Sequence, residues 1–225
     1  MIQKGGILKR VLRRYSPQIR SRGRVIRSFA NKVNFVYFGT VDQHEDDHEV
    51  IRGLTVSTSH RDTHYAVGAY DGYDVSLVDR FDVIKHGHDA PTEHNWAILQ
   101  VSLTNTDLPH IFLKPKGHSP AAYNKFFTAY NTLHIVNTMF LAAHSPEFHA
   151  RYDVFGISSR ALEIEESLTT QVTNTIAARF WPHAIEIFEG KLYVYITEHR
   201  LNETMLGATL ESATWLASVL DKRED

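Results

Sequence analysis

The chain has 225 residues, of which 43% are hydrophobic and 22% charged, as in an ordinary globular protein with one domain or two small ones. Cysteine is absent, which excludes disulfides, thiolate metal sites and cysteine nucleophiles. The net charge of −2 conceals an uneven distribution, because the first 32 residues hold ten of the 24 lysines and arginines and no acidic residue, leaving 14 basic and 26 acidic residues, a net −12, for the rest.

Residues 1–32 form a basic arm. Apolar positions within residues 7–15 recur at the i, i+3, i+4 spacing of an amphipathic helix, and Ser16-Pro17 is expected to end it. Segments of such charge bind polyanions, and the apolar stripe favours an anionic membrane surface over nucleic acid. The candidate polyanion-binding residues are Lys9, Arg10, Arg13, Arg14, Arg20, Arg22, Arg24 and Arg27.

Three other interpretations of the basic arm stay open. It could be a solvated tail, it could dock on the body of the protein or on another subunit, or it could be an arginine-rich transit peptide. The chain has no run of about 18 apolar residues, so we expect no transmembrane segment. We predict a cytoplasmic protein that attaches peripherally to a membrane.

Residues 33–118 are predicted to form a mainly antiparallel β region. The hairpin signal is strongest at Asp71-Gly72, a dipeptide suited to the positive φ angles of a tight turn. Residues 80–95 are polar and contain Gly87 and Pro91, so we expect a long loop there. The expected strands are Val33–Val41, Ile51–Thr58, Tyr65–Tyr70, Tyr73–Asp79, Trp96–Leu103 and His110–Leu113.

Residues 119–225 are predicted to be an α+β region, forming either a second unit or one continuous domain with 33–118. A helix is expected to begin at Ser119-Pro120. After it we expect a strand at Phe148–Ile157, a helix at Ser159–Phe180, a hairpin of Ile185–Phe188 with Leu192–Ile196, and a helix at Asn202–Leu220. The predicted class is therefore α+β, with an antiparallel sheet followed by a strand, helix, hairpin and helix.

The region 148–220 resembles a domain of unknown function found in bacterial proteins, some of them membrane-associated. The residues that carry the resemblance are Phe148, Tyr152 and Val154, then Leu168-Thr169, Ile185, Ile187 and Leu192–Tyr195. Val33–Gly39 and His60–Gly72 likewise resemble stretches of uncharacterised bacterial proteins. Relatives of the C-terminal domain are often tethered by transmembrane helices, which we do not expect in this chain, and the basic arm could serve as a peripheral substitute for them.

Seven of the 14 histidines lie between positions 44 and 94. His44 and His48 are four residues apart, as are His60 and His64, and carboxylates lie between the members of each pair. If both loops meet at one end of the sheet, these four histidines could bind a divalent transition metal such as zinc, nickel or manganese. Both pairs fall in expected loops, where this spacing has no special geometry, so solvated histidines are the favoured interpretation and no cofactor is predicted.

The sequence contains no Gly-x-Ser-x-Gly nucleophile elbow, no phosphate-binding loop of the Gly-x-x-x-x-Gly-Lys-Ser/Thr type and no Gly-x-Gly-x-x-Gly. We therefore predict a non-enzymatic module that the basic arm brings to an anionic membrane surface or a protein partner. The alternatives are a metal-binding protein or metal-dependent enzyme that uses the histidine-rich loops, and nucleic-acid binding through the arm. The sequence leaves the oligomeric state open.

Overall fold

The computed structural model describes residues 17–40, 60–86, 89–117, 131–136, 141, 143, 145–196 and 201–222. Within these residues one nine-stranded sheet has the order β1-β2-β3-β4-β9-β8-β5-β7-β6, and each pair of neighbours is antiparallel. The strands are β1 Val36–Thr40, β2 His60–Tyr70, β3 Tyr73–His86, β4 Asp89–Ser102, β5 Ile111–Pro115, β6 His134–Ile135, β7 Tyr152–Gly156, β8 Ala184–Phe188 and β9 Lys191–Ile196. The helices are α2 Pro17–Lys32, α5 Pro146–Arg151, α6 Ala161–Ser167, α7 Thr170–Phe180 and α8 Glu203–Leu220, with a 3₁₀ turn at Ser158–Arg160.

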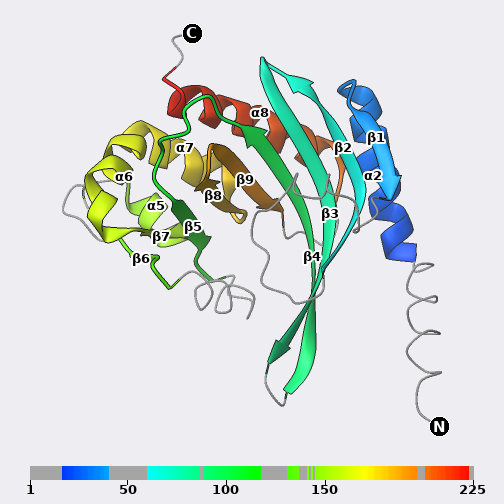
Figure 1. Cartoon of the computed structure of the whole chain (residues 1–225), viewed down its shortest axis with the longest axis horizontal. Coiled ribbons are helices and arrows are strands. Elements are labelled where there is room, and N and C mark those ends of the chain that lie inside the picture. The colour runs from blue at the N-terminus through cyan, green and yellow to red at the C-terminus, as the bar shows by residue number, and fades with distance from the viewer. Residues whose placement is uncertain are drawn as a thin grey trace.

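The predicted α+β class is confirmed. The hairpin β8–β9 lies in the middle of the sheet, where β9 pairs with β4 and β8 pairs with β5 (Figure 1). Strands from the two halves of the chain therefore share one sheet.

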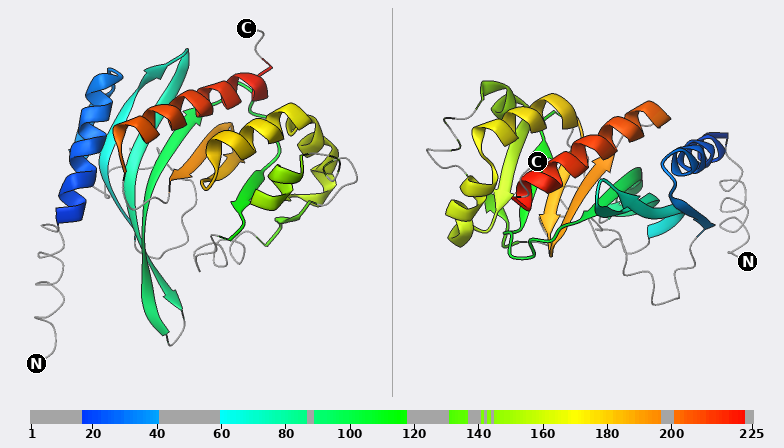
Figure 2. Two further views of the ribbon diagram at one scale, coloured as in Figure 1. Left: turned by 180° about the vertical axis from the view of Figure 1, so that it is seen from behind. Right: turned by 90° about the horizontal axis from the view of Figure 1, so that it is seen from above.

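The helices lie on one face of the sheet (Figure 2). The larger apolar cluster fills the space between them, and it includes Ile26 and Phe29 of α2, Ile176 of α7 and Leu210 of α8. A second, aromatic cluster lies on the opposite face and includes Val78, Trp96, Ile98, Phe112, Tyr193 and Tyr195. Because strand side chains alternate between faces, both clusters draw on the same central strands.

Both predicted hairpins are present. Asp71 and Gly72 have φ angles of 52° and 76°, and Glu189 and Gly190 have 48° and 67°. Each pair thus takes the left-handed conformation at both central turn positions, which matches the twist of the flanking strands.

The C-terminal helix α8 begins where the sequence predicted. The Asn202 side chain accepts a hydrogen bond of 2.8 Å from the Met205 backbone N–H, as an N-cap does. Replacing Asn202 by alanine should lower the free energy of unfolding by about 1 kcal/mol, measured by urea denaturation. A change no larger than that of Glu211→Ala, on the exposed side of the same helix, would argue against a capping role.

The expectation of a long loop over residues 80–95 is wrong. The strands β3 and β4 continue through most of it, with Ile84 opposite Thr92 and His86 opposite Asp89, and they project beyond the body of the molecule (Figure 1). Two adjacent strands satisfy their backbone hydrogen bonds by pairing with each other, and this does not require apolar side chains. A polar sequence is therefore compatible with a strand, and its polarity was not sufficient to predict a loop.

Two further boundaries differ in the C-terminal half. The expected strand at Phe148–Ile157 starts only at Tyr152, because α5 precedes it, with Pro146 in its first turn and the Ser145 hydroxyl accepting from the Glu147 N–H. The single helix expected over 159–180 is divided at Leu168, and Thr169 caps the start of α7. The expected strand at Ile51–Thr58 and the helix start at Ser119-Pro120 lie outside the described residues.

None of the helices in the described part of the chain combines the length and the apolar character needed to cross a bilayer.

Candidate functional site

The second half of the predicted basic arm is the helix α2, and it packs on the sheet. Its Ile26, Phe29 and Ala30 are buried, and the Phe29 ring meets the Phe35 ring edge-on with 6.5 Å between their centres. Gly23 lies so close to β2 that a Cβ there would come within 2.4 Å of the His64 ring. The helix α2 is therefore part of the folded body, which it contacts from its second turn onward.

A buried ion pair also holds α2 to the sheet. The Arg22 guanidinium donates to both carboxylate oxygens of Asp79 on β3, with 2.7 Å between Nη2 and Oδ1 and 3.2 Å between Nε and Oδ2. Both residues are only 6% exposed. Arg22, which the sequence placed among the polyanion-binding residues, thus has its charge neutralised inside the fold.

The outward side of α2 carries arginines in the positions that the sequence singled out. Arg24 and Arg27 are exposed, and with Arg20 they stand at i, i+4 and i+7 of the helix, so the three positions share one side. The Arg27 guanidinium lies 5.8 Å from the centre of the Tyr37 ring. Lys32 is exposed at the end of the helix. The candidates Lys9, Arg10, Arg13 and Arg14 lie outside the described residues.

The histidines proposed for a metal site are only partly described. His44 and His48 lie outside the described residues, and His60 pairs with Asp82 across β2 and β3. His64 sits at a β-bulge with φ 56°, stacks on Tyr37 and shares a hydrogen bond of 2.7 Å between Nδ1 and the tyrosine oxygen. Its burial lowers its pKa, and nearby Arg22 acts in the same direction, while Asp79 opposes both. Within the described ranges no three His, Asp or Glu side chains come together as a metal site would require.

The opposite face of the sheet holds a buried polar cluster that the sequence did not predict. The Glu186 carboxylate accepts from the Tyr195 hydroxyl and lies 2.8 Å from Nε2 of His110, and these residues are at most 9% exposed. Nearby, Arg80 donates to both carboxylate oxygens of Asp62 at 2.7 and 2.8 Å. The one signal in the sequence was Glu186 between Ile185 and Ile187 in an otherwise apolar strand.

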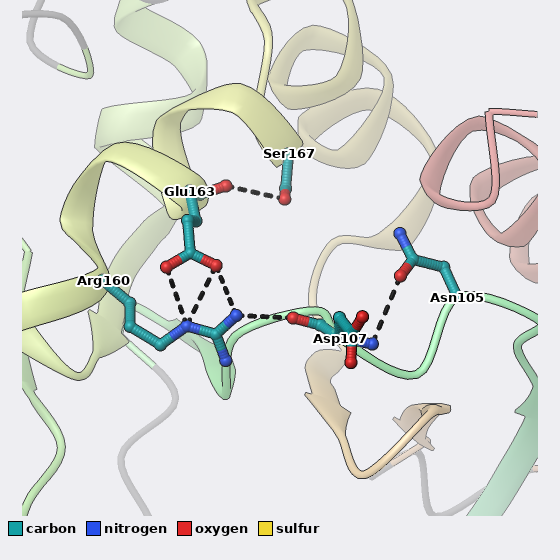
Figure 3. Close-up of polar contacts among 5 residues, drawn as sticks. All are labelled: Asn105, Asp107, Arg160, Glu163 and Ser167. Carbon is teal, nitrogen blue, oxygen red and sulfur yellow. Dashed lines mark hydrogen bonds and ion pairs between the residues drawn. The ribbon is translucent and has the colours of Figure 1, made fainter.

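A cavity of about 370 Å³ opens where the β4–β5 loop meets α6, α7 and the end of α8. Its lining includes Asp107, Glu163 and Glu166 with the apolar Leu108 and Val219. Two of the lining residues share a partner, because Arg160 binds the Glu163 carboxylate and also donates to the Asp107 carbonyl (Figure 3). These contacts tie α6 to the loop, so the Glu163 carboxylate of the lining is engaged in a structural contact.

Comparisons with known proteins identify the fold. No family model matches the chain, and no curated protein matches it either. The crystal structure of the mycobacterial trehalose monomycolate transport factor A, TtfA, superposes with a TM-score of 0.62 over 89% of this chain and 95% of that one, at 12% sequence identity. The two chains share a fold over nearly their full lengths, and at this identity the likeness extends to the fold alone.

Proposed function

We propose that this protein is a non-enzymatic binding module, associated with transport, that an anionic membrane surface recruits through the basic residues 1–32. The observation that carries the proposal is the outward side of α2, where Arg24 and Arg27 are exposed on a helix fixed to the sheet by Arg22 and Asp79. Both arginines belong to residues 1–32, a segment that holds ten basic residues and no acidic residue.

The charge distribution supports an anionic partner. A net −12 on the rest of the chain repels an anionic surface, so attraction would be confined to the end of the molecule that carries α2. Each Lys or Arg close to such a surface contributes about 1 kcal/mol at ordinary ionic strength. A few such residues therefore suffice for reversible attachment.

The structural neighbour supports the non-enzymatic part of the proposal. TtfA is described as a transport factor for trehalose monomycolate, which is a role in moving a molecule rather than in converting it. We infer a comparable accessory role here, in which the folded body meets a partner while residues 1–32 hold it at the membrane.

Reversing the charge of Arg24 and Arg27 tests the proposal. Sedimentation with vesicles of phosphatidylcholine, with and without phosphatidylserine, should show that the wild-type chain binds only the anionic vesicles and is released by salt. Arg24→Glu with Arg27→Glu should weaken binding at least about tenfold, since four units of charge change near the surface. Removing residues 1–16, which carry five of the ten charges, should have a comparable effect.

Arg179→Glu with Lys222→Glu is the matched control. Both side chains are exposed, at the ends of α7 and α8, and the net charge changes by the same amount. This variant should bind like the wild type. Equal loss in both variants would show a response to net charge alone, and preferential binding of duplex DNA by the wild type would replace the membrane with nucleic acid as the partner.

A further inference from the structure

The edge strand β1 carries two apolar side chains that lie outside the core. Val36 and Phe38 are 58% and 57% exposed. Phe35 and Tyr37 alternate with them and lie on the side of α2, where Phe35 is buried and Tyr37 contacts Arg27. Val36 and Phe38 therefore lie on the opposite face of the sheet, where the Phe38 ring centre is 5.8 Å from that of Tyr65 at the edge of the second cluster.

Charged and apolar groups meet at one end of the molecule. Figures 1 and 2 show α2 and β1 together at this end, with the helix on one side of the strand. An edge-on approach to a flat surface presents Arg24 and Arg27 on one side of β1 and Val36 and Phe38 on the other. Peripheral membrane proteins use this combination, because cations bind lipid headgroups while apolar side chains reach the boundary with the acyl chains.

We propose that Val36 and Phe38 insert into the interfacial layer of an anionic bilayer. This inference rests on the proposed function, since the charges of residues 1–32 would bring β1 to the surface. Charge complementarity argues for a lipid surface, because the cations beside the apolar pair match anionic headgroups. Membrane binding then has two contributions. Salt weakens the electrostatic attraction of the arginines, but it does not weaken the insertion of Val36 and Phe38.

The backbone of β1 argues against a second copy of the chain as the occupant of this edge. The register shifts on both sides of Gly39, which has φ 73°, interrupt the β1–β2 ladder. Bulges of this kind twist an edge strand and disfavour pairing with another strand. The exposed side chains, rather than the open backbone edge, are thus the feature available to a partner.

A single label tests the insertion directly. Because the chain has no cysteine, Phe38→Cys creates a unique site for an environment-sensitive fluorophore such as NBD. On anionic vesicles its emission should shift to the blue, and quenchers attached to the acyl chains should reduce it. The same label at Leu162→Cys, a residue that is 72% exposed on α6 away from β1, should report water in both conditions.

Affinity gives the second measurement. Val36→Ser with Phe38→Ser should weaken binding to anionic vesicles about tenfold while leaving the slope of affinity against salt unchanged. The matched control is Ile135→Ser with Leu162→Ser, which removes two apolar side chains elsewhere that are somewhat more exposed than Val36 and Phe38. This control should bind like the wild type.

The outcomes separate this inference from the proposed function. If the wild type binds anionic vesicles through residues 1–32 but the label at position 38 stays in water, insertion is wrong and electrostatic recruitment stands. If the wild type binds no anionic vesicle, the proposed function fails and insertion fails with it. If the label shifts without vesicles and the molecular mass doubles, a second copy occupies β1 and the inference is overturned.

Discussion

Asp79→Asn is expected to lower the free energy of unfolding by about 3–5 kcal/mol, because it removes a carboxylate that neutralises the buried Arg22 guanidinium. The two side chains form a close pair at 2.7 Å, and Arg22 is 6% exposed. Solvent therefore cannot replace the lost carboxylate. Chemical denaturation followed by tryptophan fluorescence measures the loss.

Two further variants decide whether the pair itself is responsible. Asp74→Asn removes an exposed carboxylate from the same strand and should change the free energy of unfolding by less than about 0.5 kcal/mol. Arg22→Met with Asp79→Leu removes both charges and should recover most of the stability, since apolar residues of similar volume replace buried ion pairs well. An Asp79→Asn loss no larger than that of Asp74→Asn would show that the ion pair does not hold α2.

The pair also links stability to the proposed function. The exposed Arg24 and Arg27 are displayed on a helix whose position Arg22 and Asp79 help to fix. Because Arg22 faces inward, it should contribute to vesicle binding only through that position. Arg22→Met with Asp79→Leu, once shown to be folded, should therefore bind anionic vesicles much like the wild type.

Acidification is also expected to destabilise the fold, and the buried His183 contributes to this effect. Its side chain is buried, Nδ1 has no hydrogen-bond partner among the described residues, and burial lowers its pKa to about 4. The folded state thus favours the neutral imidazole, so on acidification the unfolded chain takes up the proton first. The contribution of His183 to the free energy of unfolding is fully present above about pH 6.5, the pKa of a histidine in the unfolded chain. It should fall by about 3 kcal/mol as the pH decreases from there to about 4.

Urea denaturation at a series of pH values between 7 and 4 tests this expectation. His183→Gln should flatten the decline over that range, because the variant has no proton to take up at this position. His134→Gln, which alters an exposed histidine on β6, should leave the decline unchanged. The burial of His64 lowers its pKa as well, so a smaller slope of the same sign should remain in His183→Gln. A slope identical to that of the wild type would show that His183 is not the titrating group.

The histidine hypothesis stays a prediction, because His44 and His48 lie outside the described residues. His60 and His64 were paired because they stand four residues apart, yet both lie on β2. There His64 uses Nδ1 for Tyr37 and packs against α2 at Gly23. A Cβ at Gly23 would also come within 2.5 Å of His64 Nε2, so both ring nitrogens of His64 lie against other parts of the fold.

The sequence by itself determined the features that depend on a few neighbouring residues. Asp71-Gly72 forms a turn because both residues accept positive φ, Gly190 supplies the same freedom in the second hairpin, and Asn202 caps α8 through a group three residues away. The separation of charge between residues 1–32 and the rest of the chain is likewise a property of composition. These features led to the α+β class and to the basic segment as the candidate site.

Only the tertiary structure decided which charges face solvent and how the strands are ordered. Arg22 and Asp79 are 57 residues apart, and His110 and Glu186 are 76 apart, so neither pairing leaves a mark on local sequence. The insertion of β8–β9 between β4 and β5 likewise depends on strands from distant parts of the chain. The physical reason is that the burial of a side chain depends on what packs against it. Arg22 and Arg24 have the same chemistry and lie two residues apart, but the helix turns one toward the sheet and the other toward water.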